Sequence, residues 1–308
     1  MIDGRLLECD GQVEIEENFN RILSLNGLIY GVTFYVDVNA GVDTNNGLTW
    51  ATAFKTLAVA IAASNVIIAL NATGWASRNR ILFKGDNDEA HKETLITLPN
   101  KCDVIGVGSY DHRSYPILIG NHLIGAGAYM GTRFVNMGFR SLAAGGAIFT
   151  VPGTTSGLQF VMCFFDGSTA TPGTIAISLT AVELARIAFN EFIGAFSTSA
   201  IVIGAGESNG LMIEGNKILG AVKGIQVDIG MTTSIRGGAI LRNYIDTSGM
   251  AIDENSDKLL IADNLLNSAA GNGYAACVDV AITRCVGNVL TTANGTCYDL
   301  PPKAGALA

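Results

Sequence analysis

The sequence predicts an all-β protein, a parallel β-helix in which each coil of the chain stacks on the previous one. One observation is a short apolar motif built around an asparagine. It recurs at positions 136, 163, 190, 216, 243, 264 and 288, a spacing of about 21 to 27 residues that is typical of solenoids. The second observation is that the repeats are short β-branched and aromatic runs separated by Gly, Asn, Ser and Thr, with no helical periodicity between them.

Each period also contains a second apolar run. These runs occupy residues 146–149, 174–177, 200–203, 224–227, 249–252, 275–278 and 295–298. Two or three short strands per turn, with glycine-rich corners between them, make the coil of a parallel β-helix. Neighbouring coils would pair at about 4.8 Å, and no single coil can bury its apolar side alone.

The asparagines of the repeat are expected to form a stack along the rod. They are Asn136, Asn190, Asn216, Asn243, Asn264 and Asn288, and Cys163 takes the place once. Stacked amides can hydrogen-bond to one another, and asparagine also tolerates the left-handed backbone of a sharp corner. We therefore expect a structural role for this row; a row that binds sugar or metal is the alternative.

Residues 1–33 lie outside the repeat and predict an arm that consists of a short strand and an amphipathic helix. Its apolar face comprises Ile15, Phe19, Ile22 and Leu23. An isolated helix of this length is marginal in water. This face therefore needs a partner, either the β-helix body or another chain, and we expect it to anchor an assembly.

The most distinctive part of the sequence runs from residue 34 to residue 63. A strand, Phe34-Tyr35-Val36-Asp37, is followed by an Asn/Asp/Gly-rich loop and then by Ala53-Phe54-Lys55-Thr56-Leu57. This order resembles the opening of pectate-lyase-like right-handed β-helix proteins, which include many phage tailspikes and virion proteins. The resemblance covers roughly residues 34 to 290.

The resemblance implies a right-handed single-stranded parallel β-helix over residues 34–300, with a tail at 301–308. The general preference for right-handed crossovers agrees with that hand. It also implies a capping helix near 50–63 that closes the open end of the core. The apolar face of this helix is expected to comprise Phe54, Leu57, Ala58 and Ile61.

The early coils, residues 64–134, are less regular than the later ones. Strands are expected at 66–70, 80–84, 94–98, 102–107 and 116–119. The three histidines fall in the loops of this part of the chain.

Composition excludes some classes of function. The net charge is -8 with only 19 basic residues, so we expect no nucleic-acid partner, because phosphate contacts need a basic patch. No apolar run reaches the roughly 18 residues of a membrane span. The start of the chain lacks a basic region followed by an apolar core, so we expect no secretory signal and synthesis in the host cytoplasm. The six cysteines show no Cys-x-x-Cys pattern and are expected to be small buried hydrophobes.

One loop has oxygen-bearing side chains at alternate places. They are Asp37, Asn39, Asp43 and Asn45. This spacing could suit Ca²⁺, although no Glu follows at the twelfth place, and the same residues also simply make turns. We expect no other cofactor.

Carboxylates follow the second apolar run in successive coils. They are Asp228, Asp253, Glu254 and Asp279, and Asp299 continues the row. Glycosidases need two carboxylates about 5 to 9.5 Å apart, and neighbouring coils could supply such a pair. The simpler interpretation is a row of solvated strand ends. The repeat contains neither tryptophan nor a cluster of acids and bases typical of a lyase.

The expected function is that of a non-enzymatic structural virion protein of a phage. The resemblance implies a homotrimer on the virion surface, either a capsid decoration or cement protein or a short tailspike, with capsid or tail proteins as further partners. Two alternatives stay open: a polysaccharide-degrading tailspike, acting as glycosidase or lyase, and a passive adhesin for host glycans.

Overall fold

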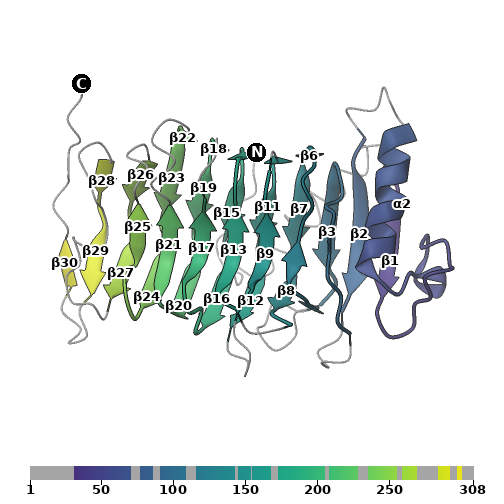
Figure 1. Cartoon of the computed structure of the whole chain (residues 1–308), viewed down its shortest axis with the longest axis horizontal. Helices are drawn as coiled ribbons and strands as arrows, with labels where there is room; N and C mark the ends of the chain where they lie inside the picture. Colours follow the sequence, from purple (N-terminus) through teal and green to yellow (C-terminus); the bar gives the residue numbers. More distant parts are fainter. Residues whose placement is uncertain are drawn as a thin grey trace, which may run out of the picture.

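The computed structural model describes residues 31–70, 77–85, 91–108, 116–142, 145–153, 155–167, 173–204, 208–227, 235–254, 259–268, 284–291 and 297–299. These residues form a parallel β-helix. Strands stack along one long axis, helix α2 lies at the N-terminal end, and β30 lies at the other end (Figure 1). The predicted fold class is therefore confirmed. The expected anchor residues Ile15, Phe19, Ile22 and Leu23, and the tail, lie outside the described residues.

Three long sheets run along the described rod. The ten-stranded sheet contains β1 (Thr33–Asp37), β2 (Asn79–Lys84), β3 (Cys102–Gly106), β7 (Thr132–Val135), β11 (Gln159–Val161), β15 (Arg186–Ala188), β19 (Met212–Glu214), β23 (Gly238–Leu241), β26 (Leu259–Ala262) and β28 (Arg284–Val286). The nine-stranded sheet contains β4 (Ile117–Ile119), β8 (Gly138–Arg140), β12 (Phe164–Gly167), β16 (Glu191–Gly194), β20 (Lys217–Ala221), β24 (Tyr244–Thr247), β27 (Leu265–Ser268), β29 (Val289–Thr291) and β30 (Cys297–Asp299).

The six-stranded sheet contains the second apolar run of five successive periods, from residues 146–149 to 249–252. It contains β5 (His122–Leu123), β9 (Ala147–Val151), β13 (Ile175–Leu179), β17 (Ser199–Ile203), β21 (Lys223–Val227) and β25 (Ile252–Glu254). Two small sheets complete the coils, one of β6 (Tyr129–Met130), β10 (Thr155–Ser156) and β14 (Val182–Glu183), the other of β18 (Ser208–Asn209) and β22 (Ile235–Arg236).

Side chains alternate between the inside and the outside of the rod along each strand, and the inward ones fill its interior. In the ten-stranded sheet the register places Phe134, Phe160, Ile187, Ile213, Ile240 and Ile261 in one inward column, and all are fully buried. Rings also stack between coils: the ring centroids of Phe165 and Phe192 lie 4.7 Å apart at 7°. Such stacking follows from parallel, in-register strands, because the spacing of about 4.8 Å between coils lies within the range of centroid distances that aromatic pairs prefer, about 4.5–7 Å.

The predicted capping helix is present, but its bounds differ from the prediction. A short 3-10 helix, η2 (Trp50–Thr52), precedes α2 (Leu57–Leu70). The predicted strand at 66–70 is therefore wrong, because its apolar run continues the helix. Ala58 is exposed, whereas Ala60 and Ser64 are buried, so the predicted apolar face is also wrong at that residue.

Carboxylates from two separate loops accept hydrogen bonds from the backbone amides at the start of α2. Glu93 accepts hydrogen bonds from the backbone nitrogens of Leu57, at 3.0 Å, and Ala58. Asp43 accepts from the backbone nitrogens of Lys55 and Thr56, at 2.9 and 2.8 Å. Acidic groups at this end of a helix are favourable because the first amides lack partners in the helix.

Two further strand predictions are wrong. Residues 94–98 form no strand: Leu95 and Leu98 are buried, but the backbone there is irregular. Residues 295–298 were expected to continue the second run in parallel. Instead, β30 pairs antiparallel with β29 in the nine-stranded sheet, with Asp299 opposite Val289.

Candidate functional site

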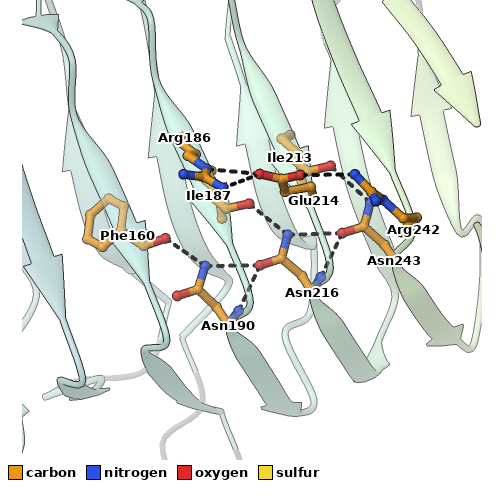
Figure 2. A network of polar contacts seen from close by, with 9 residues as sticks. All are labelled: Phe160, Arg186, Ile187, Asn190, Ile213, Glu214, Asn216, Arg242 and Asn243. Carbon is orange, nitrogen blue, oxygen red and sulfur yellow. Dashed lines mark hydrogen bonds and ion pairs between the residues drawn. The ribbon is translucent and has the colours of Figure 1, made fainter. Parts of the chain in front are cut away.

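The most developed polar feature of the described chain is a ladder of buried asparagines. We call Asn190, Asn216, Asn243, Asn264 and Asn288 the asparagine ladder; each is at most 3% exposed. The Nδ2 atom of each residue donates to Oδ1 of the next at 2.9 Å, as Figure 2 shows for the first three. The predicted stack is thus confirmed for these five residues.

Each interior rung has its hydrogen-bonding groups satisfied. Besides its bond to Asn243, Asn216 Nδ2 donates to the carbonyl of Ile187 at 2.8 Å. Asn216 Oδ1 accepts from both the backbone nitrogen and Nδ2 of Asn190, at 3.0 and 2.9 Å. A buried amide is costly only when its groups lack partners, so the ladder joins coils at no such cost.

Asn136 is not a member of the ladder, which corrects the prediction. Because Val135 pairs with Val161, Met137 occupies the place of Cys163, and Asn136 precedes it. Asn136 has φ of 53°, and its Nδ2 donates to the carbonyls of Gly106 and Gly108. The repeat was misaligned by one residue here because an asparagine happened to stand at the corner.

The left-handed corner and the ladder are therefore separate positions. The residue before each ladder asparagine has a positive φ; these residues are Phe189, Gly215, Arg242, Asp263 and Gly287. The sharp turn is thus made before the asparagine, and the ladder side chains are free to hydrogen-bond inside the rod. Positive φ is uncommon outside glycine, which shows how strongly the stacked coils impose this corner.

A pair of charged clusters lies on the outer face of the ten-stranded sheet. Glu214 forms ion pairs with Arg186 on the preceding coil and, at 3.5 Å, with Arg242 on the following one (Figure 2). Asp103 likewise accepts from Arg78 and from Arg133, the latter at 2.9 Å through both Nε and Nη2. Each cluster has two guanidinium groups and one carboxylate.

Asp103 shows how much such a cluster depends on its arginines. Its side chain is only 3% exposed, and burial alone would raise the pKa of the carboxyl. The hydrogen bonds from Arg78 and Arg133 outweigh burial and lower the pKa of Asp103 below its ordinary value. The carboxylate is therefore held ionised between two bases.

Sequence reasoning missed these arginine positions. Arg133, Gln159 and Arg186 stand in one outward column. They lie four residues before Met137, Cys163 and Asn190, which share the ladder place in their coils. The same period that located the ladder could have located this column. The charged side chains beside this column occupy other positions in the strand register. Only the structure shows that they lie next to the column.

The carboxylate row proposed for catalysis does not form at Asp253. Its neighbour on the preceding coil is Gln226, not an acid. The Asp253 carboxylate pairs with Lys223 at 2.7 Å. Glu254 ends the same strand, Asp299 lies in a different sheet, and Asp228 and Asp279 lie outside the described residues.

The loop considered for calcium uses its side chains for its own backbone. Asp37 Oδ1 accepts from the nitrogens of Asn39 and Ala40, both at 3.1 Å, and its Oδ2 pairs with Lys84 at 2.7 Å. Asp43 caps helix α2, and Asn45 Nδ2 donates to the carbonyl of Ala53. Burial opposes ionisation of the Asp37 carboxyl, but its hydrogen bonds to Lys84 and to the backbone outweigh burial and lower its pKa.

No clustered metal ligands appear in the described part of the chain. A group of three or more His, Cys, Asp or Glu side chains that could hold an ion is absent from those residues. Cys102, Cys163 and Cys285 are buried, as expected. Burial raises the pKa of Cys102 and Cys163 to about 12.

His122 is a buried ionisable group that packs against aromatic rings. Its Nδ1 accepts from the backbone nitrogen of Leu95 at 3.1 Å, and its ring centroid lies 4.7 Å from that of Phe149. Burial lowers its pKa from 6.5 to about 3, and Nε2 has no hydrogen-bond partner among the described residues. His122 therefore packs as a neutral core residue.

The sequence matches no model of a known protein family and no curated protein. Among the described residues, none of the helices has both the length and the apolar character needed to cross a membrane.

Proposed function

We propose that this chain is a non-enzymatic structural protein of a bacteriophage particle, either a homotrimeric capsid decoration or cement protein or a short tailspike. The asparagine ladder is the observation that carries this proposal. It uses a row of buried polar side chains to hold each coil on the next. The result is a stiff body suited to bearing load on a particle surface.

The charged residues support the same function. Lys217 pairs with Glu191 at 2.7 Å and Arg140 with Asp166 at 2.8 Å, each pair joining adjacent coils. Asp253, the described candidate for acid/base chemistry, pairs with Lys223. A single exposed ion pair contributes little to stability, but repeated ion pairs along a rod add to its resistance to unfolding. A particle protein must persist for long periods, so slow unfolding is the property that matters.

The opening of residues 34–63 supports a phage origin through its resemblance to virion proteins. Association into a trimer is supported by apolar side chains on the outer faces. Tyr244, Leu260, Leu265 and Val286 are each 37 to 38% exposed, and exposed apolar groups in numbers favour contacts between chains.

The proposal is tested on purified source particles with antibodies against this chain. Electron microscopy should show label over the whole shell for a decoration protein, or at one vertex for a tailspike. Light scattering of the purified chain should give the mass of a trimer. Unlabelled particles, or a stable monomer at micromolar concentration, would rule the proposal out, and cleavage of a host polysaccharide by the purified chain would rule out its non-enzymatic part.

A further inference from the structure

The helix that caps the rod is apolar on both of its faces. Helix α2 lies at the N-terminal end of the described rod (Figure 1), and its inner face, with Leu57 and Ile61 fully buried, covers the core. Its 14 residues contain no charged side chain. Of its two polar residues, Ser64 is buried and Asn65 hydrogen-bonds to nearby backbone groups. The side of α2 that faces away from the core therefore consists almost wholly of apolar groups.

The described residues leave this outer side exposed. It comprises Ala58, Ala62, Val66 and Ala69, which are spaced along one face of the helix, and the last residue Leu70. We call these five residues the cap face. Val66 is 58% exposed and Leu70 75%. The end cap of a solenoid needs a polar outer face, because that face meets water, so an apolar cap face requires a further covering element.

The chain enters the described structure beside α2. Val32 N donates to Asn79 Oδ1 at 2.9 Å, and Asn79 Nδ2 donates to the carbonyl and the hydroxyl of Ser64, at 3.1 and 3.0 Å. A Cβ on Gly31 would overlap the Arg78 carbonyl oxygen, so the chain passes directly against the backbone at this point. Residues 1–30 therefore join the described chain within one side chain of the capping helix.

The segment that joins here has the apolar spacing of a covering helix. Its apolar positions recur at i, i+4, i+7 and i+8, at Ile15, Phe19, Ile22 and Leu23. A helix of this length is marginal in water without a partner. Its large side chains complement the alanines of the cap face, since packed helices alternate large and small residues across facing positions. The segment and the cap face therefore each supply the apolar surface that the other lacks.

The connection is long enough to lay this helix along α2. Residues 24–30 span up to about 24 Å when extended, whereas a helix of 14 residues such as α2 is about 21 Å long. A flexible link this short also gives a millimolar effective concentration, which exceeds that of separate copies at micromolar concentration. The tether therefore favours the segment of the same chain over that of another copy.

Other segments near α2 are too short to provide the cover. Two stretches outside the described residues, 71–76 and 86–90, adjoin the elements next to α2. Each must leave the rod and return to it within six residues or fewer, so neither can extend along the cap face.

We infer that the cap face of α2 is the docking surface for residues 13–23 of the same chain, which cover it as a second helix. The inference goes beyond the proposed function, because it concerns one chain and holds whether or not three chains associate. It gives the apolar face of residues 15–23 a partner within the chain instead of in an assembly.

Photo-cross-linking in the full chain tests this docking. A benzophenone amino acid replaces Val66 on the cap face or, as the control, Leu123, which is 60% exposed on the six-stranded sheet. After irradiation, peptide mass spectrometry should find the probe at Val66 joined to residues 13–23, and the probe at Leu123 joined elsewhere or not at all. When isotope-labelled and unlabelled chains are mixed, each joined pair of peptides should carry a single isotope.

Proteolysis of charged variants tests the same contact without a probe. Arg5 and Arg21 are the tryptic sites of the segment, and Val66→Glu with Leu70→Glu adds none. This double variant should be cleaved after Arg21 about tenfold or more faster than the parent chain, because burying unpaired charges opposes docking. Leu123→Glu is the matched control and should be cleaved at the parent rate. Circular dichroism confirms that each variant is folded.

Joined peptides that carry two isotopes would assign the cover to a second copy and overturn the inference. A probe at Val66 that leaves residues 13–23 unmodified would overturn it too, as would equal cleavage after Arg21 in the parent and the double variant. Each of these results leaves the structural function standing, whereas unlabelled particles would remove that function and leave the docking intact.

Discussion

Asn243 Oδ1 lies 2.9 Å from both the backbone nitrogen and the side-chain nitrogen of Asn216, 27 residues earlier in the chain. One carbonyl oxygen thus fixes both the main chain and the side chain of the preceding coil. Repetition of this contact along the ladder means that no rung can be removed without leaving groups on two coils unpaired. The ladder is therefore expected to control the stability of the rod.

Replacing Asn216 by Ala should lower the free energy of unfolding by about 3 kcal/mol or more, because several buried groups lose partners that are worth about 1–3 kcal/mol each. These groups include the carbonyl of Ile187 and the side chain of Asn190. Urea unfolding followed by circular dichroism measures the change. Lys217→Ala, on the same coil but exposed, is the control and should cost under about 1 kcal/mol. Equal effects for both variants would contradict a special role for the ladder.

Replacing Cys163 by Asn should extend the ladder by one rung. The Cys163 backbone nitrogen already donates to Asn190 Oδ1 at 2.8 Å, and its Sγ lies 3.5 Å from the Phe134 carbonyl, which is the contact that Nδ2 makes in the other rungs. We expect stabilisation by about 1 kcal/mol, the net worth of a hydrogen bond. Thermal unfolding measures it, with Cys163→Ala as the comparison. Destabilisation of the Asn variant as large as that of the Ala variant would show that this place cannot hold an amide.

His122 should make the protein less stable as the pH falls. Burial lowers its pKa to about 3 in the folded chain, against 6.5 when unfolded, so below pH 6.5 the unfolded chain takes up a proton that the folded chain does not. This costs about 1.4 kcal/mol per pH unit, accumulating from pH 6.5 down to pH 3. Asp37 and Asp103, whose folded pKa values are lowered, add losses only near and below their ordinary value of 3.8.

The measurement is the free energy of unfolding between pH 4.5 and pH 7 for the parent chain and for His122→Gln. Gln can still accept from the Leu95 nitrogen but does not titrate in this range. The slope with pH should decrease in the variant, whatever its stability at pH 7. An unchanged slope would mean that His122 is accessible to protons in the folded chain.

Asp253→Asn tests the remaining acid/base candidate. Its partner Lys223 is 32% exposed, so loss of the pair should cost no more than about 1 kcal/mol. If the chain is structural, neither parent nor variant releases reducing sugar or unsaturated uronate from host polysaccharides. Activity of the parent that the substitution abolishes would assign Asp253 to catalysis instead.

The two cysteines with raised pKa should be unreactive in the folded protein. Cys102 and Cys163 are fully buried, and a thiol with a pKa of about 12 has almost no thiolate at pH 8. Iodoacetamide followed by peptide mass spectrometry should modify them only in denaturant. Rapid labelling without denaturant would show that the rod opens locally.

The parallel β-helix and five of the six expected ladder residues could be predicted from the sequence alone. Both follow from a repeat period, which indicates which segments of the chain stack on one another. The sequence also located the capping helix, through the resemblance of residues 34–63 to the opening of known β-helix proteins. These inferences depend on spacing and residue type, which a linear sequence contains.

Only the tertiary structure decided the details that depend on register between coils. It placed Asn136 at a corner rather than in the ladder, because pairing of Val135 with Val161 shifts that coil by one residue. It set Gln226 rather than an acid beside Asp253, and it brought Arg186, Glu214 and Arg242 together from three coils. Loops of unequal length change the spacing between coils, so a period alone cannot say which side chains meet; the hydrogen bonds between strands settle that.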